Sequence, residues 1–76
     1  MTGYLVVIEG DSEQGYSAYS PDLPGVIAAA EEREEIEPLM REAMAFHIEG
    51  LREAGEPVPE PATEVVAAVF IDPDAA

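Results

Sequence analysis

The sequence predicts an α+β fold with the element order β-β-β-α-β, a four-stranded sheet and one helix packed on one face of it. Two observations lead to this prediction. Four short apolar segments rich in β-branched or aromatic residues are separated by glycine- and proline-containing turns. Between the third and the fourth, the spacing of apolar residues changes to the 3.6-residue period of an amphipathic helix. A chain of 76 residues makes one domain at most, which we place at residues 1–76.

The first three strands are expected between residues 4 and 29. Tyr4–Glu9 (YLVVIE) is apolar on both faces, which is typical of a central strand, and the polar loop 10–15 (GDSEQG) leads to a second strand at Tyr16–Ser20. Pro21 has no amide hydrogen for a sheet, so the SPDLPG segment should end that strand and turn the chain. Val26–Ala29 is then the third strand.

The helix is expected from Arg33 to Ala54. Pro38 fits only near the start of a helix, so either the first full turn begins near Glu35 or an earlier turn is bent there. One stripe of the helix is apolar, apart from a single histidine: Ile36, Met40, Ala43, His47, Leu51 and Ala54.

A fourth strand is predicted after the stiff segment 57–61 (PVPEP), in TEVVAAVFI from Thr63. Because β-α-β crossovers are right-handed, this strand should lie parallel to the third strand and beside the first. The predicted strand order is therefore 3-2-1-4. One helix covers only one face of such a sheet, and the other face is left for water or a partner.

The charge of the chain is strongly one-sided. It has 17 acidic residues against three arginines and no lysine, a formal net charge of −14. Such a chain is repelled by nucleic acid, so we expect no direct nucleic-acid binding. The same field would speed encounter with a basic protein, although solubility alone also explains it. The absence of cysteine, of a leader-like segment and of a long apolar run predicts a cytoplasmic protein that is not in a membrane.

Candidates for chemistry are few. His47 falls in the apolar stripe, where a packed histidine is the expected role. The acids at positions 9, 11 and 13 resemble the opening of a calcium loop, but Gln14 and Ser20 stand where its glycine and bidentate glutamate belong. Ser17 and Ser20 are not accompanied by a recognisable general base and orienting residue, as a catalytic triad would require. We therefore predict no catalytic residue, no bound metal and no cofactor.

Two motifs in order strongly resemble the HicB-type antitoxins. These are YSAYSPDLPGV at 16–26 and REAMAFHIEGLREAGEPVPEP at 41–61, and the resemblance covers most of the chain. It implies a partial ribonuclease-H-like fold that binds and masks a basic HicA-type mRNA endoribonuclease toxin. Full-length members usually continue into an operator-binding domain. This chain stops after DPDAA, so we expect no such activity from it.

The resemblance also points to a contact surface for the toxin on the second strand and the following turn. The residues it implies as partner-binding are Tyr16, Tyr19, Asp22 and Leu23. The alternative is that the two tyrosines only stabilise the hairpin. Since the first and last strands are apolar on both faces, we also expect a homodimer or a higher homo-oligomer.

Three hypotheses on function follow. The first, which we favour, is an antitoxin that neutralises a basic toxin. The second is a solitary oligomeric protein of the same fold that binds another partner or ligand. The third is a degenerate ribonuclease-H-like nuclease, which would need acids clustered around magnesium, whereas the acids here are spread over turns and the helix surface.

Overall fold

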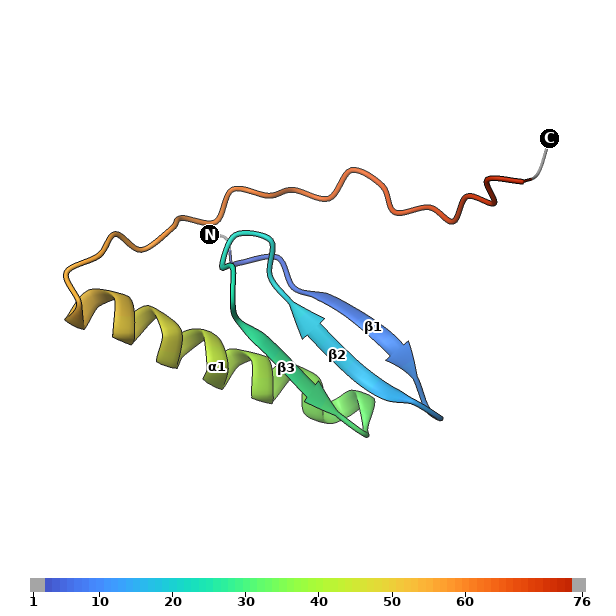
Figure 1. Ribbon diagram of the computed structural model, residues 1–76, viewed down its shortest axis with the longest axis horizontal. Helices are drawn as coiled ribbons and strands as arrows, with labels where there is room; N and C mark the ends of the chain where they lie inside the picture. The colour runs from blue at the N-terminus through green and yellow to red at the C-terminus, as the bar shows by residue number, and fades with distance from the viewer. Residues whose placement is uncertain (1–2, 75–76) are drawn as a thin grey trace.

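The computed structural model describes residues 3–74 and shows a three-stranded antiparallel sheet with one helix across it (Figure 1). The strands are β1 (Val7–Asp11), β2 (Gly15–Tyr19) and β3 (Ile27–Ala30), followed by the helix α1 (Arg33–Glu53). The three strands and the helix lie within a few residues of their predicted positions. No helix in this part of the chain is both long and apolar enough to cross a bilayer.

The prediction of a four-stranded sheet in the order 3-2-1-4 is wrong. Within residues 3–74 the sheet contains three strands in the order β1-β2-β3. The segment 63–71, where the fourth strand was expected, is extended but pairs with no strand of the described chain, and in Figure 1 it runs apart from the sheet in orange and red. A high β propensity makes a segment fit a sheet, but a strand forms only where a partner edge is within reach.

Two contacts explain where this segment runs. The Tyr4 hydroxyl donates a hydrogen bond to the Pro59 carbonyl oxygen, and the Asp22 carboxylate accepts hydrogen bonds from Ala62 and Thr63. The chain is therefore held across the end of the sheet that carries the β2–β3 turn. From there it continues away from β1 instead of returning along it.

Two tight turns join the strands. In the first, the Asp11 carboxylate accepts hydrogen bonds from the backbone N–H groups of Glu13 and Gln14, at 2.9 and 2.7 Å. In the second, the Leu23 N–H donates to the Ser20 carbonyl and the Val26 N–H to the Leu23 carbonyl, both at 3.2 Å. Gly25 closes this turn with a φ of +91°, a backbone conformation that residues other than glycine rarely adopt.

The helix α1 runs from Arg33 through Pro38 without interruption, so it begins earlier than the start near Glu35 that was one of the two predicted alternatives. Glu32 stands at the N-cap, and its backbone N–H donates to the Glu35 carboxylate at 3.4 Å. Acidic residues in this first turn are favoured by the positive end of the helix dipole.

The core lies between α1 and the sheet. It consists of five buried side chains: Ala18, Leu23, Val26, Ile36 and Met40. The helix packs mainly against β2 and β3, so the β1 side of the sheet is less covered. His47, which we predicted in the packed stripe, is only half-buried, while Met44 and Ile48 pack against the core.

Candidate functional site

The face of the sheet opposite α1, which we call the open face, carries an apolar row across all three strands. Val7 pairs with Tyr19, and Tyr19 pairs with Ile27, so the three side chains lie on the same face. Tyr19 is 42% exposed and Ile27 is 73% exposed. Glu9 follows Val7 on this face and places an acid beside the row. The open face therefore offers apolar contact area next to negative charge.

The four residues predicted to bind a partner do not share one surface. Tyr19 lies on the open face. Tyr16 lies opposite Ala30, is half-buried and packs against the core on the helix side of the sheet. Leu23 is fully buried as part of the core. Of these three, only Tyr19 has the exposure and position of a direct anchor.

Asp22 acts on the chain itself. Its Oδ2 accepts hydrogen bonds from the backbone N–H groups of Ala62 and Thr63, both at 2.9 Å, and its Oδ1 accepts one from the Thr63 hydroxyl at 2.8 Å. These bonds favour the ionised carboxylate, and they hold the pKa of Asp22 below its ordinary value, the Thr63 N–H having the largest effect. This role was missed because no local pattern links positions 22 and 63.

The edge of the sheet formed by β3 is acidic. Two shallow hollows lie between β3 and α1. One is lined in part by Tyr16, Glu31 and Glu35, and the other in part by Glu42 and Phe46. Phe46 is exposed on the helix surface. A basic partner would find carboxylates both here and on the open face.

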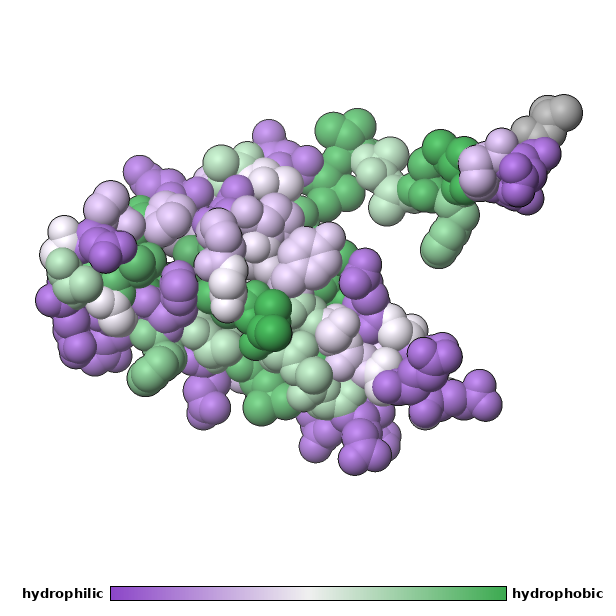
Figure 2. Space-filling model, viewed as in Figure 1, coloured by the Kyte–Doolittle hydropathy of each residue, from purple (hydrophilic) through white to green (hydrophobic). Residues whose placement is uncertain are grey.

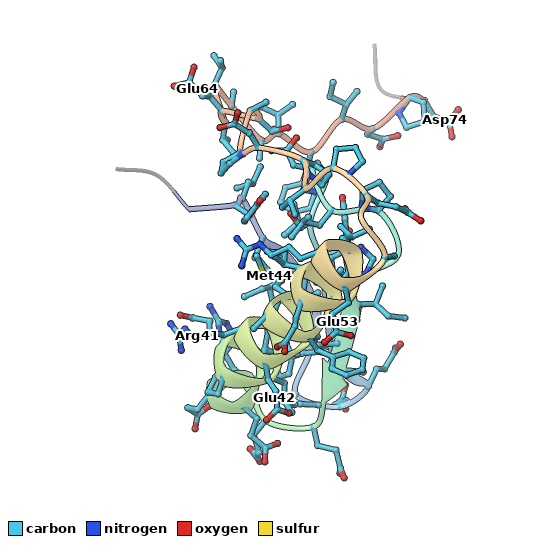
Figure 3. All side chains as sticks on the ribbon, turned by 90° about the vertical axis from the view of Figure 1, so that its left-hand side faces the viewer. Arg41, Glu42, Met44, Glu53, Glu64 and Asp74 are labelled. Atoms are coloured by element: carbon cyan, nitrogen blue, oxygen red, sulfur yellow. The ribbon has the colours of Figure 1, made fainter. Side chains whose placement is uncertain are left out.

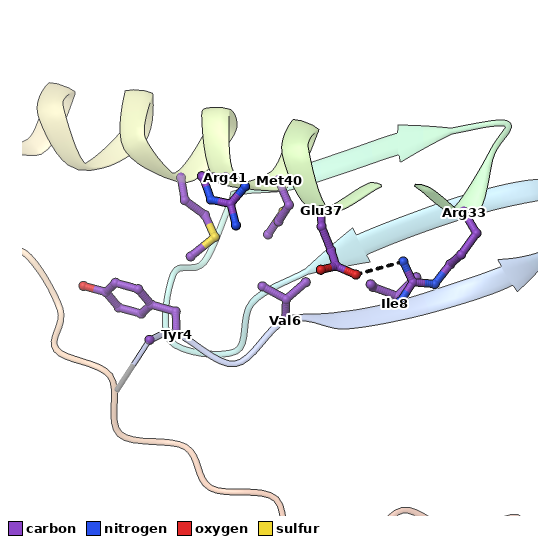
Figure 4. A pocket seen from close by; sticks show the side chains of 9 residues that line it. Tyr4, Val6, Ile8, Arg33, Glu37, Met40 and Arg41 are labelled. Atoms are coloured by element: carbon purple, nitrogen blue, oxygen red, sulfur yellow. Dashed lines mark hydrogen bonds and ion pairs between the residues drawn. The ribbon is translucent and has the colours of Figure 1, made fainter. Parts of the chain in front are cut away.

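The opposite edge of the sheet has a different character. A groove of about 550 Å³, which we call the β1 groove, lies between β1 with its preceding residues and α1. Its walls are mainly apolar side chains together with two arginines and one glutamate, as Figure 4 shows: Tyr4, Val6, Ile8, Met40, Met44, Arg33, Arg41 and Glu37. Arg33 is paired with Glu37 at 3.1 Å. The sequence predicted a fourth strand beside the first strand at this edge, and the structure has none there within residues 3–74.

Residues 3–74 contain no group of three or more histidine, aspartate or glutamate side chains arranged to hold a metal ion. The geometry supports a binding surface.

Comparison with known protein families gives one match to this sequence. Residues 4–75 match the family model described as the HicB_like antitoxin of bacterial toxin-antitoxin systems. The match covers nearly the whole chain. No curated protein matches the sequence.

Proposed function

We propose that this chain, which belongs to the HicB-like antitoxin family, binds and masks a basic HicA-type mRNA endoribonuclease. The family supports an antitoxin role in general. A net charge of −14 favours a basic partner, because complementary long-range fields raise the rate of association. A toxin that cleaves mRNA acts where mRNA is found, so the proposed site of action is the cytoplasm.

The observation that carries the proposal is the apolar row of the open face. Tyr19 lies at its centre, flanked by Val7 and Ile27, with Glu9 on the same face. An exposed aromatic side chain within an apolar patch, surrounded by charge, is typical of residues that dominate interface energy. Tyr19 is the proposed direct anchor. Tyr16 lies on the helix side of the sheet, where it lines a hollow at the acidic β3 edge, and it is not proposed as part of the open-face contact.

Asp22 and Leu23 take supporting roles in this proposal. Leu23 fixes the turn from inside the core, and Asp22 ties the turn to the segment that follows the helix. Substitution of either residue would act on toxin binding through the shape of the turn. This differs from a direct contact, because its effect would appear in stability as well as in affinity.

The test is binding to a purified HicA-type toxin, measured by calorimetry. Tyr19→Ala should weaken binding by about tenfold or more, as expected for a central aromatic anchor. Phe70→Ala is the matched control, since it removes an exposed aromatic ring that lies outside the sheet. Phe70 also belongs to the proposed dimer surface, so the variants are compared in the same oligomeric state, where Phe70→Ala should leave toxin affinity unchanged. Full affinity of a folded Tyr19→Ala protein would reject the open face as the contact surface.

Self-association is the second part of the proposal, and we favour a homodimer. The segment after the helix exposes Val65, Val66, Val69, Phe70 and Ile71. Large exposed apolar side chains that follow one another along the chain usually mark an interaction surface, and a two-fold pair is the commonest way to cover them. An oligomer that binds some other partner remains the alternative to the antitoxin, and absence of toxin binding with self-association intact would favour it.

A further inference from the structure

The β1 groove and the C-terminal segment 63–71, which we call the arm, are complementary features of one chain. Within residues 3–74, β1 pairs with β2 alone, so the backbone of its outer edge is unpaired. Val6 and Ile8 are half-buried at this edge and face Met40 of α1 across the groove, as Figure 4 shows, and Met44 also lines the groove. A strand added beside β1 would find backbone partners at the edge and apolar side chains below it.

The arm has the composition of such a strand. Its sequence, TEVVAAVFI, contains no proline or glycine and is rich in β-branched residues. Val66 is 97% exposed and Phe70 is fully exposed, and the arm is visible in Figure 2 as green atoms projecting from the body of the molecule. A strand that is apolar on both faces is stable in water only when it is covered.

The arm leads away from the β1 edge of its own chain. Its first residue, Thr63, is fixed to Asp22 beside the β2–β3 turn, and the residues after it run past the sheet. The groove is therefore not filled by the arm of the same chain. A second copy supplies an identical arm that is not tied to this turn.

The charges favour binding of the arm in the β1 groove over binding at the β3 edge of the sheet. Arg33 and Arg41, two of the three basic residues of the chain, line the β1 groove together with one acid, Glu37, which pairs with Arg33. Arg41 has no such partner in the described residues and gives the groove its positive charge. The arm carries Glu64 and is followed by Asp72 and Asp74. In Figure 3, Glu64 and Asp74 lie on the C-terminal segment, whereas Arg41 projects from the helix.

The edge of the sheet at β3 would repel the same arm. Its hollows contain Glu31, Glu35 and Glu42. The arginines of the β1 groove equally disfavour a basic toxin there. An acidic segment of a second copy is the occupant that the charges favour.

The lengths also agree. At about 3.3 Å per residue, the nine residues of the arm span roughly 30 Å, and the eight residues from Tyr4 to Asp11 span roughly 26 Å. One arm can therefore cover the whole free edge of β1.

From these observations we propose that two copies exchange their arms, each arm adding as a strand to the β1 edge of the other copy and filling its β1 groove. The exchange is two-fold symmetric, so both arms and both free edges are covered at once. The inference extends the homodimer of the proposed function by naming the surfaces that form it, and it does not depend on the toxin.

The first test measures the mass of the purified full chain by light scattering and sedimentation at micromolar concentration. The expected result is a dimer. The double variant Val66→Asp with Phe70→Asp should weaken dimerisation by about a hundredfold or more, because two carboxylates would enter an apolar groove. Phe46→Asp is the control, since Phe46 is exposed on the helix outside the groove, and it should remain dimeric.

The second test locates the arm by cross-linking between introduced cysteines. Because the natural chain has no cysteine, only the introduced thiols can react. Glu9→Cys on β1 and Ala67→Cys on the arm are prepared as separate proteins, mixed and treated with a short bismaleimide. Ala67 is chosen because it alternates with Val66 and so would lie on the open face, as Glu9 does. Cross-linked heterodimers are expected. Glu42→Cys mixed with Ala67→Cys is the matched control, because it places the thiol on the helix at the opposite edge, and it should give far less product.

Three outcomes would overturn the inference: a monomer at micromolar concentration, a dimer that survives the Val66 and Phe70 substitutions, or the absence of cross-linked heterodimers while a variant that carries both Glu9→Cys and Ala67→Cys cross-links within one chain. The last result would mean that each arm folds back on its own sheet. None of these measurements includes the toxin, so failure here is separable from failure of the Tyr19→Ala binding test.

Discussion

Asp22 binds Thr63 through two hydrogen bonds, one from the backbone N–H at 2.9 Å and one from the hydroxyl at 2.8 Å, across 41 positions of the chain. This contact joins the β2–β3 turn to the segment that follows the helix. This contact sets the direction in which the arm leaves the domain. The Asp22 carboxylate, which the resemblance implied as toxin-binding, is therefore already hydrogen-bonded within the chain.

Replacing Asp22 should release the arm. In Asp22→Ala, the carboxylate oxygen that accepts hydrogen bonds from both the Ala62 and the Thr63 N–H groups is removed, so both hydrogen bonds are lost. Faster amide hydrogen exchange at positions 62 and 63 is the expected result, measured by NMR. Asp74→Ala is the control. Unchanged exchange at these two amides would show that the contact does not hold the arm.

The same contact predicts a pH dependence of stability. The pKa of Asp22 is lower in the folded chain than in the unfolded chain, so the carboxylate stabilises the fold fully above the ordinary aspartate pKa of about 3.9. This contribution is lost as the pH falls through the lowered pKa. Thermal melts of the wild type and Asp22→Asn between neutral and strongly acidic pH should therefore converge at the acidic end. A difference in melting temperature that stays constant would contradict the assignment.

Two neighbouring helix positions should differ sharply in their effect on stability. Met40 is 1% exposed in the core, so Met40→Ala should lower the free energy of unfolding by about 2–5 kcal/mol. Leu39 is 40% exposed, and Leu39→Ala should cost about 1 kcal/mol or less. Urea denaturation followed by circular dichroism measures both. Equal losses would mean that the helix faces the sheet with a different stripe.

Two glycines with open space around them should respond in opposite directions. Gly25 has a φ of +91°, so Gly25→Ala should destabilise the turn by about 1–2 kcal/mol. Gly50 lies in the helix without a positive φ, and Gly50→Ala should stabilise the fold by about 0.5–1 kcal/mol. The same urea titrations apply. A stabilising Gly25→Ala would show that the turn does not need the left-handed conformation.

Salt should affect toxin binding and dimerisation in different ways. Toxin binding joins opposite net charges, so its association rate should fall as salt rises. Dimerisation brings together two chains that each carry −14, and salt screens this repulsion, while apolar burial in the β1 groove is not weakened. We expect dimer affinity to be equal or higher at high salt. A steep loss of dimer with salt would show that ion pairs rather than the apolar groove form that interface.

The sequence alone determined the local elements of this protein. The apolar run in 4–9, the aromatic segment 16–20, the prolines and Gly25 of the turn, and the 3.6-residue period from Arg33 each act over a few residues. Their effects can therefore be predicted from local sequence alone. The composition likewise predicted a basic partner, and the two motifs predicted the family that the match over 4–75 shows. Local preference and global fold agree in this part of the chain.

Only the tertiary structure decided which residues lie on which surface and where the last apolar segment goes. The family resemblance grouped Tyr16, Tyr19 and Leu23 as one partner-binding set. The register of β2 and the packing of the turn instead place them on the helix side, on the open face and in the core. The segment from Thr63 has the same strand-like composition whether or not an edge is available to it. Its course is set by the contacts of Asp22 and Tyr4 with residues about 40 and 55 positions away, and no local pattern encodes contacts at that separation.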